Sequence, residues 1–121
     1  MSENEYINFK TKHTLEERKF ESARIKKKFN NRIPIIVECI GPTRTIQNID
    51  KHKFLTPMDL TFGQFAYVVR KRLKLNSEIG IFYFINNKMF TMSETLASIY
   101  NNEMDEDGFL YIHYSGENTF G

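Results

Sequence analysis

The chain lacks most of the features on which secreted and membrane proteins depend. Among its 121 residues, Cys39 is the single cysteine, so no internal disulfide can form, and a lone thiol fits a reducing compartment. No apolar run reaches the roughly 18 residues that a membrane-spanning helix needs. The polar and acidic start, Met1–Glu5, is unlike a secretory signal. These absences predict a cytoplasmic protein.

Signatures of catalysis and metal binding are missing as well. His13, His52 and His113 are scattered, without the Cys/His or Asp/His spacing of a metal site. Neither a glycine-rich phosphate loop nor a GxSxG nucleophile elbow is present. Cys39 falls on a strand face that we expect to be buried, where the pKa of a thiol rises and a structural role is favoured. We therefore expect no metal, no cofactor and no enzymatic activity.

Charge of one sign is never in large excess. The net charge is +2, with 12 basic and 8 acidic residues in the first 60 positions and 5 against 7 in the remainder. Two basic runs, Arg24–Lys28 and Arg70–Lys74, could contact phosphates or an acidic partner. Such runs are more often solvated helix faces, and we expect no nucleic-acid partner.

The chain does contain enough apolar and aromatic residues, 40% and 14%, to build the core of one domain. Capping boxes at Thr14–Glu17 and Thr61–Gln64 predict helices that run to about Phe29 and Leu73. A third cap, at Thr91–Glu94, predicts a short helix. Apolar runs predict four strands, at residues 33–40, 51–56, 79–85 and 109–114.

This order of elements is typical of an α+β fold, the ubiquitin-like β-grasp, with a mixed four-stranded sheet and a helix across one face. The first helix is additional to that fold and forms an N-terminal helical subdomain. We assign residues 1–30 to this subdomain, 31–114 to the β-grasp core and 115–121 to a flexible tail, all within one compact domain.

The predicted second strand suggests a peptide-binding site. It lies at the sheet edge, where unpaired backbone groups can accept an added strand. Two apolar sets flank it, at a spacing that suits a peptide with aromatic and aliphatic anchors three residues apart. They are Ile25, Pro34, Ile36 and Leu55 on one side, and Phe54, Pro57, Leu60, Phe65 and Val68 on the other. Spacing alone does not separate this interpretation from ordinary core packing.

The tail also has two interpretations. Residues 115–121 are polar, and fully extended they would carry the terminal carboxylate about 23 Å from the domain. Gly121 has no Cβ beside that carboxylate, so a narrow active site could reach it. The tail is either a frayed terminus or a carboxylate presented for activation and transfer.

Several blocks, in order, resemble the autophagy-related ubiquitin-like modifiers, the family of the GABA-receptor-associated protein and microtubule-associated light chain three. The resemblance covers residues 9–121. The matching blocks are Phe29–Ile36, Asp50–Leu55, Asp59–Phe65, Val69–Arg72 and Asp107–Tyr111, continuing through Phe120–Gly121.

The resemblance implies that Gly121 is activated by a ubiquitin-activating-like enzyme, passed to a conjugating-like enzyme and joined to phosphatidylethanolamine. Phe120 and Gly121 would be recognised by these enzymes and by a deconjugating cysteine protease. Family members usually continue past this glycine, whereas here the chain stops. The expected protein is monomeric in solution, cytoplasmic, and bound to autophagosome and precursor membranes once lipidated.

The resemblance also implies that cargo receptors and autophagy machinery dock through Trp/Phe/Tyr-x-x-Leu/Ile/Val peptides. The aromatic anchor would contact Glu21, Ile25, Pro34, Ile36, Lys53, Leu55 and Phe109. The aliphatic anchor would contact Phe54, Pro57, Leu60, Phe65 and Val68, and acidic peptide residues would contact Arg32, Lys51 and Arg72. Thr56 and Phe20 depart from the family pattern, and Phe20 could be an exposed contact for a partner or membrane.

Two other functions remain open from the sequence. The first is a β-grasp module that binds motif peptides without ever being conjugated, which conjugation at Gly121 would distinguish. The second is a nucleic-acid or cytoskeleton binder that uses the two basic runs, which a steep salt dependence of binding would reveal.

Overall fold

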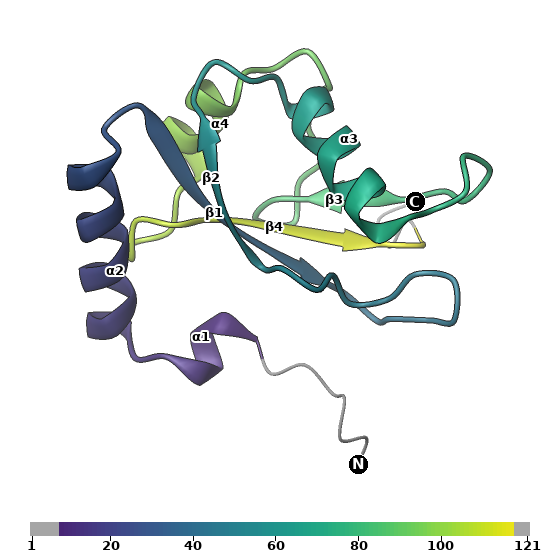
Figure 1. The fold of residues 1–121 in the computed structure, drawn as a ribbon, viewed down its shortest axis with the longest axis horizontal. Helices are drawn as coiled ribbons and strands as arrows, with labels where there is room; N and C mark the ends of the chain where they lie inside the picture. The colour runs from purple at the N-terminus through teal and green to yellow at the C-terminus, as the bar shows by residue number, and fades with distance from the viewer. Residues whose placement is uncertain (1–7, 118–121) are drawn as a thin grey trace.

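The computed structural model describes residues 8–117, in which helices pack around one sheet (Figure 1). The elements, in chain order, are α1 (Phe9–Lys12), α2 (Leu15–Lys28), β1 (Arg32–Cys39), β2 (Lys53–Pro57), α3 (Phe62–Leu73), β3 (Phe82–Phe84), α4 (Leu96–Glu103) and β4 (Leu110–Ser115). No helix among these residues is long and apolar enough to cross a membrane.

The two longest helices begin where their capping boxes predict. The Thr14 side chain accepts a hydrogen bond from the Glu17 amide at 3.1 Å, and the Glu17 carboxylate accepts one from the Thr14 amide at 2.8 Å. Thr61 and Gln64 make the same pair of bonds at the start of α3. Each box satisfies two amides that have no partner inside the helix, which fixes where the helix starts.

The sheet has the strand order β2-β1-β4-β3. β1 pairs with β2 in antiparallel orientation and with β4 in parallel, and β3 pairs antiparallel to β4. This mixed four-stranded sheet confirms the predicted α+β ubiquitin-like fold. It also makes β2 an edge strand, with its second edge unpaired within the sheet.

Side chains of β1 alternate between two separate cores, because successive residues of a strand point to opposite faces. Ile35 and Val37 join α3 in the larger core, and Cys39 packs against its margin. Ile36 points the other way and packs with Ile25 of α2. Figure 1 shows α2 and α3 on opposite sides of the sheet, and we call these sides the α2 face and the α3 face.

A buried carboxylate attaches the N-terminal helices to the sheet. Asp107, which is 1% exposed, accepts hydrogen bonds from Arg18 of α2 at 2.7 Å and from the Tyr111 hydroxyl at 2.5 Å. It also accepts the amide of Phe109 at 2.8 Å. The Ser22 hydroxyl of α2 donates to the carbonyl of the same aspartate. The predicted helical subdomain is therefore bonded to the turn that precedes β4.

The predicted start of α4 is wrong. Thr95, rather than Thr91, is the N-cap, and its side chain accepts from the Ser98 amide at 3.2 Å. The segment before Thr95 serves another element, because the carbonyls of Met92 and Glu94 accept hydrogen bonds from the first amides of α3.

The strand boundaries also differ from prediction: β1 is shifted by one residue, and β2 begins at Lys53 rather than at residue 51. β3 covers only Phe82–Phe84 of the expected 79–85, because Ile79 lies in a turn closed on Asn76 and Ile85 pairs with Lys88 in a separate bridge. β4 continues to Ser115, which pairs with Phe82 and is 5% exposed. The tail predicted to begin at residue 115 therefore begins after a buried serine.

Candidate functional site

The outer edge of β2 has backbone groups available for another strand. The Val37 amide donates to the His52 carbonyl at 2.8 Å. In an antiparallel ladder, hydrogen-bonded residue pairs alternate with pairs that are not hydrogen-bonded to each other. Lys53 and Leu55 belong to the intervening pairs, opposite Ile36 and Pro34. Their backbone groups therefore point away from β1, toward the open edge.

The residues predicted to contact an aromatic anchor do lie together. Ile25, Ile36 and Phe109 form one buried cluster on the α2 face, and the half-buried Leu55 packs against it. Pro34 lies beside them, directly opposite Leu55 in the sheet. The floor of this aromatic set is fully buried, while Leu55 and Lys53 retain access to the edge of β2.

Glu21 of α2 and Lys53 of β2, the remaining members of the aromatic set, are joined by an ion pair. The Lys53 ammonium contacts Glu21 Oε2, and Arg24 contacts Oε1 of the same carboxylate at 2.8 Å. Hydrogen bonds from Lys53 and then Arg24 hold the pKa of Glu21 below its ordinary value of 4.5. The pair therefore links the helix to the strand at the entrance of the aromatic set.

This ion pair predicts a loss of stability in acid. Because the folded-state pKa of Glu21 is lowered, its contribution is complete above pH 4.5 and disappears as the pH falls through the lowered value. The contribution is about 0.5–1 kcal/mol, since the Glu21 side chain is 25% exposed. Urea unfolding at about pH 6 and about pH 3 should show a smaller acid loss for Glu21→Gln than for the parent.

The exposed Glu94, for which no side-chain bond occurs among the described residues, is the matched control. Glu94→Gln should retain the full acid loss of the parent. An identical loss in Glu21→Gln would show that the Glu21 contacts contribute nothing to folding.

Most residues predicted to contact an aliphatic anchor lie on the α3 face. The rings of Phe54 and Phe65 meet edge to face at 5.5 Å between centroids, and Leu60 packs against the same core. Pro57 is half-buried at the end of β2, and Val68 on α3 is 42% exposed. The aliphatic set therefore has a buried aromatic base and an accessible aliphatic margin.

Apart from Pro57 at the strand end, the two sets lie on opposite faces of the sheet, and this agrees with anchors three residues apart. Side chains of an extended peptide alternate between faces, so residues separated by an odd number point in opposite directions. A peptide added along β2 would direct its first anchor to the α2 face and its fourth residue to the α3 face.

The three predicted charge contacts are distributed along β2. Arg32 lies opposite Pro57, and its guanidinium donates to the Leu55 carbonyl at 3.2 Å. At the other end of the strand, the Lys51 ammonium lies 4.9 Å from the centre of the Phe54 ring. Arg72 contacts Asp50 at 2.8 Å and lowers the pKa of that carboxyl. Lys51 and Arg72 thus belong to the α3 face.

The remaining predicted residues, Phe120 and Gly121, lie outside the described residues. The chain leaves β4 after Ser115 and bends at Gly116, where an added Cβ would come within 2.8 Å of Ile46. Burial raises the pKa of the Cys39 thiol, as expected of a structural cysteine. Within residues 8–117, no group of three or more His, Cys, Asp or Glu side chains could hold a metal ion.

Sequence reasoning missed a cavity of about 470 Å³ between α1 and α2. Its walls include Phe9 and His13, which belong to a helix of only four residues that no periodic pattern predicts. The available signal was Phe20, which departs from the family pattern and is 72% exposed.

Comparison with known proteins assigns the chain to a family. The family model described as "Autophagy protein Atg8 ubiquitin like" matches residues 17–121. The chain belongs to the Atg8 family. It is 54% identical over 114 residues to Autophagy-related protein 8A of Oryza sativa subsp. indica, covering 94% of this chain and 95% of that protein. It is 53% identical, with the same coverage, to Autophagy-related protein 8c of Arabidopsis thaliana.

Solved structures of Atg8 proteins have the same fold. Trypanosoma brucei ATG8 superposes with a TM-score of 0.84 at 41% identity, covering 97% of this chain and all of that one. Plasmodium falciparum Atg8 in complex with a Plasmodium falciparum Atg3 peptide gives a TM-score of 0.85 at 30% identity, with coverage of 93% and 98%. The Plasmodium protein therefore binds a peptide from the autophagy machinery.

Membership settles the class of function. Atg8 proteins are ubiquitin-like modifiers of autophagy, a non-enzymatic family whose members are conjugated to phosphatidylethanolamine and bind partner peptides. The chain is accordingly a modifier of this kind, as the resemblance of its sequence implied.

Proposed function

We propose that Gly121 is the acyl donor and that the two sets beside β2 receive the anchors of partner peptides. The family match carries the first part, because it extends to residue 121 and includes the tail. The open edge of β2 supports the assignment of the peptide-binding site. An apolar set lies on each face of the sheet, where the aromatic and the aliphatic anchor of a peptide along β2 would point.

The tail would take part in three transfers. A ubiquitin-activating-like enzyme would adenylate the Gly121 carboxylate and take it as a thioester, and a conjugating-like enzyme would receive the thioester. The amine of phosphatidylethanolamine would then attack the carbonyl and release the enzyme thiol. A cysteine protease would hydrolyse the resulting amide, and Phe120 would be read together with Gly121 at each step.

The conjugate would lie on autophagosomes and their precursor membranes, and the unconjugated chain in the cytoplasm. There the aromatic set and the aliphatic set would bind cargo receptors and autophagy machinery, with Arg32, Lys51 and Arg72 contacting acidic residues around the anchors. The protein itself would act as a monomer and contribute no catalytic group.

A reconstituted conjugation reaction tests this proposal directly. The chain is incubated with cognate activating and conjugating enzymes, ATP and phosphatidylethanolamine liposomes, and the product is identified by intact mass. A gain equal to the lipid minus one water supports conjugation. If the same enzymes lipidate another Atg8 protein but leave this chain unchanged, the conjugation proposal fails and peptide binding alone remains.

The aromatic set predicts a loss of peptide affinity in Leu55→Ala. Leu55 packs against the buried Ile25 and Ile36 while remaining half-buried at the edge. Its truncation should remove contact area from the bound anchor and cost about 1–2 kcal/mol, or roughly 5- to 30-fold in Kd. Calorimetric titration with an aromatic-x-x-aliphatic peptide measures the change.

Ile79→Ala is the matched control, because Ile79 is also half-buried but packs against the margin of the larger core away from β2. It should leave peptide affinity unchanged. Equal affinity of Leu55→Ala and the parent, with both shown to be folded, would remove Leu55 from the binding site.

A further inference from the structure

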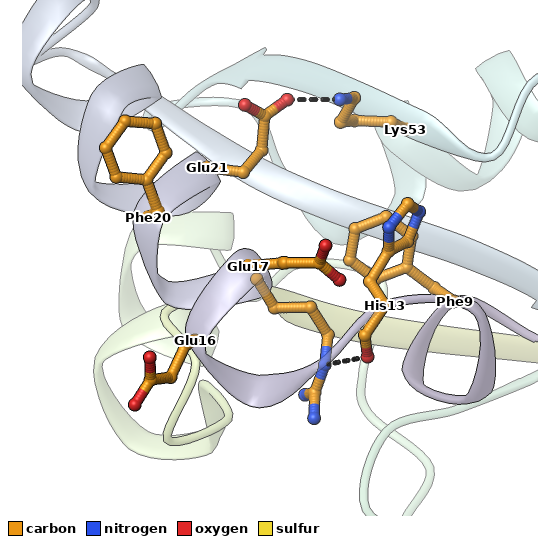
Figure 2. A pocket seen from close by; sticks show the side chains of 8 residues that line it. Phe9, His13, Glu16, Glu17, Phe20, Glu21 and Lys53 are labelled. Atoms are coloured by element: carbon orange, nitrogen blue, oxygen red, sulfur yellow. Dashed lines mark hydrogen bonds and ion pairs between the residues drawn. The ribbon is translucent and has the colours of Figure 1, made fainter.

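Thr56 belongs to neither predicted anchor set, yet it lies on the same face of the sheet as most of the aliphatic set. Figure 2 shows the side chain of Lys53, at the start of β2, directed toward Glu21 of α2. Successive residues of a strand point to opposite faces, so Thr56, three residues farther along, points to the α3 face with Phe54. Its strand partner Ile33 lies in the larger core on that face.

The Thr56 hydroxyl is an exception among the buried polar side chains of residues 8–117. The others are Ser22, Glu38, Asp107 and Ser115, and each of them makes a hydrogen bond. The Thr56 side chain makes none within that range, although the residue is only 6% exposed. Every fully enclosed side-chain nitrogen or oxygen of the same residues has a partner. The unpaired Thr56 oxygen therefore reaches the surface.

A peptide docked along β2 would bring its second anchor level with this oxygen. The aromatic set adjoins Lys53 and Leu55, whereas the aliphatic set adjoins Pro57 at the end of the strand. A peptide whose aromatic anchor comes first therefore runs parallel to β2. Its fourth residue lies about 10 Å beyond that anchor, level with Thr56 and Pro57. Of these two residues, Thr56 is the one that points to the α3 face, as the fourth peptide residue does.

An apolar anchor at that place would leave the Thr56 hydroxyl without a partner. Leucine, isoleucine or valine would remove the oxygen from solvent and supply no hydrogen-bonding group in exchange, which weakens binding. A threonine anchor has nearly the shape of valine and adds one hydroxyl, which can both donate and accept. Two facing hydroxyls can therefore satisfy each other.

The surroundings of Thr56 favour threonine over other polar anchors. The base of the aliphatic set is the edge-to-face pair of Phe54 and Phe65, and threonine offers these rings a methyl group that serine lacks. The amide of asparagine or glutamine would bring two more polar atoms into an apolar site. A carboxylate would be attracted to Lys51 and Arg72, but these cations lie at the start of β2, whereas Thr56 lies near its end.

We infer that Thr56 is a specificity-determining residue of the peptide site. Its hydroxyl pairs with that of a threonine at the fourth position, so the site admits partner peptides with an aromatic-x-x-threonine core. This inference rests on the proposed docking of peptides along β2. It goes beyond that proposal by naming a class of partner peptide that a purely aliphatic second anchor excludes.

Calorimetry with two matched peptides tests the inference. The peptides carry valine or threonine at the fourth position and are otherwise identical. In Thr56→Val, the valine peptide should gain affinity and the threonine peptide should lose it. The ratio of the two dissociation constants should therefore change roughly tenfold relative to the parent. Because both exchanges nearly preserve shape, the change in ratio reports the pairing of the two hydroxyls.

Three further variants locate the effect. Thr56→Ser retains the hydroxyl and should keep a ratio close to that of the parent. Thr11→Val makes the same chemical change at an exposed threonine of α1 and should also keep the ratio. Leu55→Ala should weaken both peptides to the same extent, because it acts on the aromatic anchor that they share.

Urea unfolding of the parent and Thr56→Val separates a role in binding from a role in folding. If the substitution changes the free energy of unfolding but not the ratio of dissociation constants, Thr56 is a core residue only and the inference fails. Equal gains for both peptides in Thr56→Val would mean that the variant site is simply more apolar, which also overturns the pairing. If the parent binds neither peptide, or if Leu55→Ala weakens neither, the proposed docking fails and the inference fails with it.

Discussion

An alanine in place of Gly121 is expected to abolish the lipid conjugate while leaving the fold and peptide binding unchanged. The added Cβ sits beside the carbonyl that each enzyme must activate, and a displacement of about 1 Å at a reacting centre can lower a rate about 100-fold. Conjugation of Gly121→Ala should therefore fall at least to that extent. The measurement is the reconstituted reaction with liposomes, followed by intact mass over time.

Asn118→Ala is the matched control, because it alters the same tail without adding atoms at the reacting carbonyl. It should be conjugated at a rate close to that of the parent. Conjugation of Gly121→Ala at the parental rate would refute the assignment of Gly121 as the acyl donor.

The second large effect is expected from Asp107→Ala. The substitution removes the carboxylate that accepts hydrogen bonds from Arg18, Phe109 and Tyr111, and it leaves a guanidinium whose side chain is only 11% exposed without its closest anion. Breaking a buried ion pair in this way costs about 3–5 kcal/mol. Urea unfolding at neutral pH should show a decrease of that size.

Glu106→Ala provides the comparison, since the neighbouring side chain is exposed and its loss should change the unfolding free energy by less than about 0.5 kcal/mol. Burial and the bond to Asp107 raise the pKa of the Tyr111 hydroxyl. Ultraviolet titration of tyrosine should therefore show one group ionising more readily in Asp107→Ala. A stability loss below about 1 kcal/mol would mean that α2 is held mainly by apolar packing.

The features predicted correctly from sequence are those that depend on neighbouring residues. Thr14 and Thr61 start their helices because each capping box closes within four residues. The alternation of Ile35, Ile36 and Val37 between two cores follows from the period of a strand. These local rules, together with the resemblance to a family, were sufficient for the sheet, whereas the roles of the two anchor sets stay a prediction.

The wrong predictions involve residues whose partners are distant in sequence. Thr91 has an acceptable cap sequence, but the backbone that follows it bonds the start of α3, so Thr95 begins the helix instead. Ser115 extends β4 because Phe82 pairs with it across the sheet. The α1–α2 cavity depends on a bond between Phe9 and Glu38, and no spacing within either segment predicts that bond.

The hydrogen bond from Arg32 to the Leu55 carbonyl affects how the edge of β2 would behave when many copies of the protein are close together. An open strand edge can pair with the same edge of another copy, and this hazard grows with concentration. Attachment to lipid would confine many copies to a two-dimensional layer, where neighbours collide often. Arg32 occupies one acceptor of the edge, and Pro57 offers no amide at its end. A motif peptide would displace the arginine by supplying both anchors, whereas a second copy of β2 would supply neither, so the edge would discriminate against self-assembly while remaining open to motif peptides.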